Sequence, residues 1–472
     1  MIPYTEESYQ LLHDGAIAFA EMEANGIAVD TVYLDDTIER QTKRVNRLQR
    51  RLRNSETAKV WRKEFRQKTN YNSTQQLGRV LFDVMGHDCP ATTPSGQYST
   101  DEKTLASVDD PFIEAYLQIK KMQKILNTYL KGIRREVVDG FLHPFYNLHL
   151  ARTFRSSCDS PNFQNIPVRD PLIAKLVRRA FIPRPGRRIV ELDYSGIEVC
   201  IGTCYHADPT MLEYLHDKSK DMHRDMATQC YRLPRSEMQA TDAADAKRIK
   251  KIRYCGKNGF VFPEFYGDWY ADCAKAMWNN IDAMGLHLRD GTSLKQHLYS
   301  KGITSLGSLD SQFDPVKGTF AHHMKKVEHD FWNRRFPVYN QWRKDIVRQY
   351  KECGWLQMLT GFVCQGPMTK NQIINAGTQG TAFHCLLWSL IRLQKKMKKA
   401  RMRSLVIGQI HDSGLSDVPN EELQDYLGMA HETLVDDLLR EFGWINVPIE
   451  IEAEATPVNG SWYLKEEIPI NG

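Results

Sequence analysis

The sequence lacks the features of membrane proteins, of secreted proteins and of small proteins stabilised by zinc or disulfide bonds. No apolar run approaches the roughly 20 residues that a membrane span requires, and the N-terminus MIPYTEESYQ lacks the basic-then-apolar order of a signal peptide. The ten cysteines contain no CxxC pair, which argues against a zinc ribbon or a disulfide framework. Cys200, Cys204 and His206 have a loosely ligand-like spacing, but we interpret them as packing along a helix. We find no internal repeat, and we expect a soluble, cytoplasmic protein with no membrane contact.

The length and composition are those of a large globular protein. With 472 residues, 42% of them hydrophobic and 26% charged, it can bury a sizeable core in two to four domains. The formal charge of +5 is mild, but its distribution is uneven. Residues 30–68 read as one long basic helical stretch, and from Lys43 to Lys68 acids are almost missing. This suits a polyanion such as a phosphate backbone, although a solvated helix face is the alternative.

The segment RIVELDYSGIEVCIGTCYH changes its hydrophobic period in the middle. Residues 189–193 predict a short buried strand, and the apolar positions from Ile197 onward predict a helix. Asp193 therefore lies where a strand gives way to a helix, and a carboxylate there can be held rigidly while facing a cleft. The structural alternative is a turn residue followed by a capping box formed by Ser195 and Glu198.

A second acidic position lies in LVIGQIHDSGLSDVP. Two apolar runs flank a short polar tip, which is the pattern of a hairpin. Asp412 lies at the tip, where an isolated aspartate is usually only a turn residue.

Residues 151–169 show little regular periodicity but are dense in hydrogen-bonding groups. Such a loop suits contact with a sugar-phosphate backbone and the minor groove, and an irregular surface loop is the alternative. The groups are Arg155, Ser156, Ser157, Asn162, Gln164 and Asn165.

This loop also begins a resemblance. PNFQNIPVR, followed by RRAFIPRPGRRIVELDYSGIE, closely resembles the family A DNA polymerases, the relatives of bacterial DNA polymerase I. MEANGIAVD, NYNSTQQLGRVLF, KDMHRDMA, RYCGKNGFVFPEFYGD, GWLQMLTGF, NAGTQGTAF, the His-Asp hairpin and PIEIEAEATPVNGSW resemble further family segments, in family order. The matches cover residues 20–465 apart from about 286–335, and they indicate a polymerase domain of phage type.

The resemblance implies an α+β fold of the right-hand polymerase type, with an antiparallel-sheet palm and mostly helical thumb and fingers. The boundaries that we expect are a lead-in at 1–29, the thumb at 30–150, the first part of the palm at 151–230, the fingers at 231–353 with an extra insertion at about 286–335, and the second part of the palm at 354–472.

The activity that the resemblance implies is template-directed extension of a DNA primer with deoxynucleoside triphosphates. Asp193 and Asp412 would be the catalytic residues and would hold two Mg²⁺ ions, for which Mn²⁺ can substitute. Magnesium prefers oxygen ligands and shares substrate phosphates, and two such ions suit phosphoryl transfer.

Other site residues are also carried over from the resemblance. The expected nucleotide-binding residues are Arg253, Lys257, Phe262, Tyr266, His223 and Glu198, the last beside the 2′ position of the sugar. The expected DNA-binding residues are Arg155, Asn162, Gln164, Asn165, Asn375, Gln379 and His411. One extra residue between Lys257 and Phe262, together with Pro263, predicts an irregular helix.

Three positions depart from the common family pattern: Ser413 replaces a glutamate, Cys200 an arginine and Gly196 a glutamine. Two other functions therefore stay open. A single-subunit RNA polymerase would share the palm chemistry, although Glu198 argues against it, and a catalytically idle nucleic-acid-binding subunit would fit Ser413 and the basic lobe.

The expected partners are primer-template DNA and deoxynucleoside triphosphates, with the chain acting as a monomer. The thumb-like match begins within about thirty residues of Met1, which predicts that the chain has no proofreading exonuclease domain. A separate exonuclease or processivity partner is compatible with this reading, in a bacterial or phage-infected cell.

Overall fold

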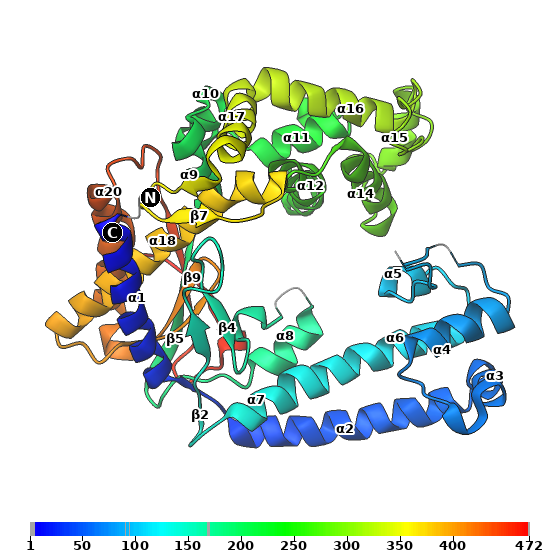
Figure 1. Ribbon diagram of the computed structural model, residues 1–472, viewed down its shortest axis with the longest axis horizontal. Coiled ribbons are helices and arrows are strands. Elements are labelled where there is room, and N and C mark those ends of the chain that lie inside the picture. Colours follow the sequence, from blue (N-terminus) through cyan, green and yellow to red (C-terminus); the bar gives the residue numbers. More distant parts are fainter. Residues whose placement is uncertain (1–4, 90, 94, 168–169, 471–472) are drawn as a thin grey trace.

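The computed structural model describes residues 5–89, 91–93, 95–167 and 170–470. The first four residues of the lead-in, and Val168 and Arg169 of the PNFQNIPVR segment, lie outside this range. Figure 1 shows a central body containing a sheet, from which a long helical arm and a larger helical lobe project. Helices and small antiparallel sheets confirm the predicted α+β class. No helix in the described ranges is long and apolar enough to cross a membrane.

The central sheet has five antiparallel strands in the order β11-β10-β5-β9-β8. Side chains alternate along β5, so Val190, Leu192 and Tyr194 are buried while Glu191 and Asp193 point to the other face. The Tyr194 hydroxyl donates to the carbonyl of Leu434 over 2.9 Å, which ties the buried face to the helices behind it. The strands are β5 (Arg187–Tyr194), β8 (Leu405–Ile410), β9 (Ser413–Pro419), β10 (Ile451–Ala455) and β11 (Glu466–Ile468).

Helices cover the buried face of this sheet and share one hydrophobic cluster with it. The long helix α18 crosses the body and packs against α1 and α9 (Figure 1). The helices of the body are α1 (Glu6–Asn25), α8 (Pro171–Arg178), α9 (Ile197–His206), α18 (Lys370–Lys399), α19 (Leu423–His431), the π-helical η9 (Glu432–Asp437) and α20 (Leu438–Glu441). The short paired strands are β1 (Ile27–Ala28) with β2 (Phe141–Leu142), β3 (Phe145–Asn147) with β4 (Ser157–Asp159), and β6 (Trp355–Gln357) with β7 (Val363–Gln365).

The arm is built on α2 and α6, which lie side by side (Figure 1). The basic helical stretch expected over residues 30–68 is present, but it is divided: α2 ends at Arg53, and Ser55 caps a new helix by accepting from the amide of Ala58. A separate cluster around the buried Trp61 forms the core of the tip. The helices of the arm are α2 (Thr31–Arg53), α3 (Glu56–Phe65), α4 (Thr74–Gly78), η2 (Arg79–Val84), α5 (Glu102–Leu105), α6 (Pro111–Lys124), η3 (Ile125–Leu130) and α7 (Lys131–Glu136).

The larger lobe has its own hydrophobic cluster, to which residues 286–335 contribute Leu294, Phe320 and Phe331. This segment, which matched nothing in the sequence comparison with the family, is therefore part of the lobe's core. Met211, Met222 and Met226 belong to the same cluster. The helices are α10 (Pro209–His216), α11 (Met222–Cys230), α12 (Ala243–Gly256), η6 (Lys257–Val261), α13 (Phe262–Tyr266), α14 (Tyr270–Ala283), α15 (Leu294–Ser300), α16 (Phe320–Asp330), η7 (Phe331–Arg335) and α17 (Pro337–Cys353).

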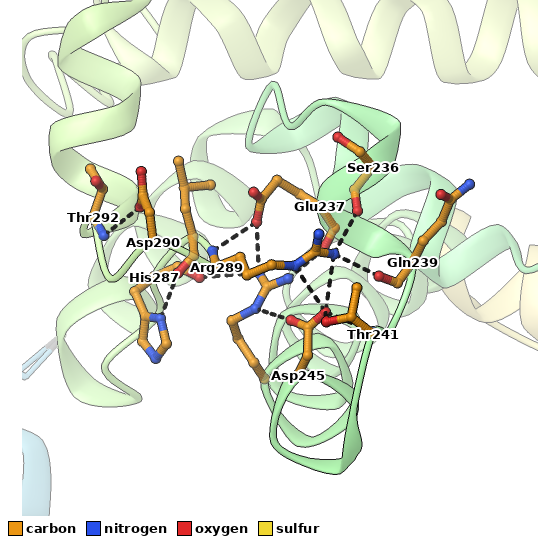
Figure 2. A network of polar contacts seen from close by, with 11 residues as sticks. Ser236, Glu237, Gln239, Thr241, Asp245, His287, Arg289, Asp290 and Thr292 are labelled. Atoms are coloured by element: carbon orange, nitrogen blue, oxygen red, sulfur yellow. Dashed lines mark hydrogen bonds and ion pairs between the residues drawn. The ribbon is translucent and has the colours of Figure 1, made fainter.

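Arg289 fastens the start of this segment to the loop before α12, as Figure 2 shows. Its guanidinium donates to the carbonyls of Ser236 (2.9 Å) and Gln239 (2.7 Å) and to the carboxylate of Asp245 (3.1 Å). Asp245 also pairs with Arg248 within α12, over 2.7 Å. The extra segment is thus held to the lobe by a polar network as well as by apolar packing.

Candidate active site

Asp193 and Asp412 come from neighbouring strands of the central sheet. Asp193 is the last residue but one of β5, and Asp412 lies in the turn between β8 and β9. Because Asp193 is paired with Ser413 in the register of β5 and β9, the residue before Ser413 comes to lie beside it. The predicted strand end and hairpin are both confirmed.

The electrostatics of this pair favour bound cations. Burial raises the pKa of Asp193 to about 7, and the charges of Asp412, Glu191 and Glu452 add to the effect. The pKa of Asp412 is also raised, by burial and by Glu198, against the opposing charge of Arg155. Among the described residues, the buried Oδ1 of Asp412 has no hydrogen-bond partner.

These oxygen donors fit a divalent ion such as magnesium. Within the described part of the chain, no group of three ligating side chains is close enough to hold an ion unaided. A magnesium ion at this place would complete its shell with water and substrate phosphates, as it commonly does.

Arg155 bridges the carboxylates on the open side of the sheet. Its Nη1 donates to Glu198 over 2.9 Å, and its Nη2 lies 3.7 Å from Oδ1 of Asp412. The loop that carries Arg155 therefore reaches the acidic pair itself.

The capping box expected for Ser195 and Glu198 is wrong. The N-cap of α9 is Gly196, whose φ of 67° is left-handed, and no side chain caps this helix. Ser195 instead donates its hydroxyl to Glu452 over 2.9 Å. Glu198 is left to accept from Arg155 and from the Tyr266 hydroxyl, the latter over 2.7 Å.

The lobe contributes an irregular helix, as predicted. The regular helix α12 ends at Gly256, the π-helical segment η6 follows, and α13 begins at Phe262. A π-helical turn accommodates one extra residue without breaking the helix, which is the length difference seen in the sequence. The Nζ of Lys257 lies 4.8 Å from the centre of the Phe262 ring, and Tyr266 is directed at Glu198.

Cationic and aromatic groups gather beside this helix. Arg253 pairs with Asp221 over 2.5 Å, and the His223 ring meets Phe262 edge-on at 5.6 Å between centroids. Burial lowers the pKa of His223 to about 4, and Arg253 and Lys257 contribute to the shift. His223 is therefore a neutral imidazole near pH 7, with its buried Nδ1 unpaired within the described residues.

A cavity of about 220 Å³ is lined by Asp412 of the acidic pair and by Phe262 and Tyr266 of α13, but not by Asp193 or Lys257. Asn375 and Gln379 of α18 also line it, and the Asn375 amide donates to the carbonyl of Tyr266 over 3.4 Å. Its lining includes Glu198, Phe262, Tyr266, Asn375, Gln379 and Asp412. Sequence reasoning thus named most of the polar residues of one cavity.

The hairpin that carries Asp412 rests on a residue that sequence reasoning missed. Gln409 is fully buried, accepts from Ser156 and from Gln164, each over 2.7 Å, and donates to the carbonyl of His411. Its signal was a lone amide within an otherwise apolar strand. The predicted DNA contact Gln164 supports the turn through this network.

Three further predicted DNA contacts lie in turns. Asn162 accepts from the amide of Asn165 within a short 3-10 turn, η4 (Phe163–Asn165). His411 occupies the left-handed region with φ of 50°, which fixes the sharp turn before Asp412.

Comparison with known proteins agrees with this arrangement. The sequence profile described as DNA polymerase family A matches residues 38–255. The DNA polymerase of Bacillus phage SP01 is 25% identical over 75% of this chain and 36% of its own length, and the thermostable DNA polymerase I of Thermus aquaticus is 26% identical over 92% and 46%. Residues 38–255 of the chain thus resemble DNA polymerase family A. The chain spans less than half the length of these curated relatives.

The fold of this chain has a solved counterpart. The structure described as "POL domain of Pol1 from M. smegmatis complex with DNA primer-template and dNTP" superimposes with a TM-score of 0.70 at 21% identity, over 96% of this chain and 70% of the other. This likeness confirms the predicted right-hand polymerase fold.

The three departures from the family pattern have local explanations. Gly196 occupies a left-handed conformation that a glutamine would adopt only with strain. Cys200 is buried, with its Sγ 3.7 Å from the carbonyl of Pro448. Ser413 is buried and donates to the carbonyl of Ile410 over 3.0 Å.

Proposed function

We propose that this chain extends the 3′ end of a DNA primer along a template, using deoxynucleoside triphosphates. The observation that supports this most is that Asp193 lies beside the turn of Asp412, and that Asp412 lines one cavity with Phe262, whose ring contacts Lys257, and with Tyr266. Phosphoryl transfer depends on positioning and on electrostatic stabilisation, and this arrangement supplies both.

Two magnesium ions, for which manganese can substitute, would be held by Asp193 and Asp412 and would supply activation of the primer hydroxyl and stabilisation of the leaving oxygen. Lys257 and Arg253 bind the triphosphate, with His223 as a neutral hydrogen-bonding partner. Phe262 stacks near the nucleotide and Tyr266 lies by the templating base. Arg155, Asn162, Gln164, Asn165, Asn375, Gln379 and His411 contact the primer-template.

We propose that residues 30–150 form the thumb, residues 151–230 and 354–472 the palm, and residues 231–353 the fingers. The helices α10 and α11 fall in the first palm range although they pack in the larger lobe. The basic helix α2 then lies where it can follow the phosphate backbone of the duplex.

Primer extension tests the function directly. With a DNA template and magnesium, deoxynucleotides should extend the primer and ribonucleotides should be incorporated far less readily. Equal use of ribonucleotides would favour the RNA polymerase alternative, and no extension by a folded, DNA-binding chain would favour the idle subunit.

Asp193→Ala and Asp412→Ala test the metal assignment. Each should abolish extension while leaving duplex affinity, measured by fluorescence anisotropy, nearly unchanged, because these carboxylates lie at the sheet and not on the basic arm. Asp109→Ala, at an exposed carboxylate of the arm, is the control and should extend as wild type. Substantial activity in either active-site variant would contradict the assignment.

A further inference from the structure

Asp193 has two direct neighbours on the open face of the sheet. In the registers of the strands it is paired with Ser413 of β9 on one side and with Glu452 of β10 on the other. Side chains of directly opposed residues point to the same face, with Cβ atoms about 4.5 to 5.5 Å apart. One row across the sheet therefore reads Ser413, Asp193, Glu452.

The next row offers a second glutamate, but that one is already neutralised. Glu191 accepts from the ammonium of Lys465 over 2.5 Å and from the indole of Trp462 over 2.9 Å. Lys465 also pairs with Glu454, which is opposite Glu191. The carboxylates of Glu191 and Glu454 thus hold the C-terminal segment to the sheet through Lys465.

Glu452 has no such cation. Among the contacts of the described residues, it accepts only from the Ser195 hydroxyl, over 2.9 Å, and its side chain is exposed on the open face. Ser195 belongs to the turn between β5 and α9, which directly follows Asp193. This hydrogen bond holds the Glu452 carboxylate, which is paired with no cation among the described residues, beside the turn that follows Asp193.

We propose that Glu452 is a positioning residue of the cation site, and that it supplies from β10 the third negative charge that Ser413 does not supply from β9. This inference rests on the proposed function. Because no three ligands converge on one point among the described residues, Glu452 acts through water and through its charge next to Asp193. Partners in such outer positions orient the ligands and raise the affinity of a site for metal.

The test measures metal binding without catalysis. Free Mn²⁺ is titrated by electron paramagnetic resonance into the full chain, in the absence of DNA and nucleotide. Glu452→Gln, which keeps the shape and removes the charge, should weaken Mn²⁺ binding about tenfold or more. Glu454→Gln is the matched control on the same face of the same strand, and it should bind Mn²⁺ as wild type.

A rescue variant separates charge from structure. Ser413→Glu combined with Glu452→Gln returns a carboxylate to the other side of Asp193, and it should recover most of the lost Mn²⁺ affinity and lower the Mg²⁺ concentration needed for extension. Thermal melting of each variant checks folding. If Glu452→Gln melts early, Ser195→Ala, which only releases Glu452, should still weaken Mn²⁺ binding.

Wild-type Mn²⁺ affinity in Glu452→Gln, or a loss of equal size in Glu454→Gln, would overturn the inference. Failure of the double variant to recover affinity would also overturn it. Each of these results leaves the proposed function intact as long as the wild-type chain extends primers and Asp193→Ala does not. An inactive wild-type chain would instead refute the proposed function.

Discussion

The Glu198 carboxylate accepts hydrogen bonds from Arg155 of the sheet body and from Tyr266 of the larger lobe. It therefore links these two parts on the open side of the site. It is not a helix cap, since the N-terminus of α9 has no side-chain cap. A substitution there should therefore affect the cavity more than the helix. The cavity lining places this carboxylate between the aspartate turn and the aromatic residues of α13.

We predict that Glu198→Ala lowers the preference for deoxyribonucleotides over ribonucleotides by roughly tenfold to a hundredfold, the usual range when a steric obstacle is removed. The measurement is the ratio of insertion efficiencies for a deoxyribonucleotide and its ribonucleotide counterpart. Glu198→Gln keeps the bulk and is the control that should retain the preference. An unchanged ratio in Glu198→Ala would show that this side chain does not exclude the 2′ hydroxyl.

Asp193 should make stability depend on pH. Its pKa is raised to about 7, whereas an unfolded aspartate titrates near about 4. Ionisation is thus less favourable in the folded chain, so stability falls as pH rises from about 4 to about 7, and the penalty is fully present above that. Without divalent ions, we expect Asp193→Asn to raise the melting temperature at pH 8 and to change it little at pH 4.

Differential scanning calorimetry in EDTA checks this expectation. Magnesium should then raise the melting temperature of the wild type at pH 8 by mass action, and it should have less effect on Asp193→Asn. Asp109→Asn, at an exposed carboxylate, is the control. A melting temperature of Asp193→Asn that equals that of the wild type at pH 8 would refute the charge repulsion.

At the scale of elements, η6 sets the rotation of α13 relative to α12. One residue of an α-helix corresponds to a rotation of about 100°. Lys257 at the start of η6 contacts Phe262, the first residue of α13, and Tyr266 reaches Glu198 one turn later. Deleting one residue would rotate these side chains away from each other.

We predict that deletion of the exposed Asn258 lowers kcat/KM for nucleotide insertion by about 100-fold, because small displacements of positioning groups are costly. Asn258→Ala keeps the length and should behave nearly as wild type. Steady-state insertion kinetics provide the measurement, with circular dichroism to check the helices. Normal kinetics in the deletion variant would mean that the π segment does not set the position of Phe262 and Tyr266.

The sequence predicted those elements whose signals are local. The strand before Asp193, the helix after Gly196 and the hairpin around Asp412 each follow from periodicity over a few residues. The basic stretch was expected to be helical, but the break before α3 was not predicted, because the positive charge continues through the cap at Ser55. The capping box failed because a competing partner of Ser195, Glu452, is distant in sequence.

The same reason explains the site residues that were missed. Gln409 and Glu452 act through partners that are distant in sequence, and strand order and register cannot be read from one sequence. Asp193, Asp412 and Lys257 were identified by resemblance of whole segments. At Ser413 the chain lacks the glutamate of the family pattern. Only the register of the strands shows which neighbouring carboxylate could replace it.

At the scale of the whole molecule, the described elements form several packed parts, and the two aspartates lie in the sheet body. The core clusters belong to the sheet body, the arm, the lobe and the small region around β6 and β7. Excision of a mismatched nucleotide needs a second site with its own carboxylates and access to a frayed primer end. We therefore predict that the chain of this sequence extends primers but does not remove a mismatched terminus.

Incubation with an end-labelled, mismatched primer and magnesium, without nucleotides, should leave the primer at full length. Metal-dependent shortening that persists in Asp193→Ala would reveal a separate editing site, whereas shortening that disappears in that variant would assign excision to the polymerase site itself.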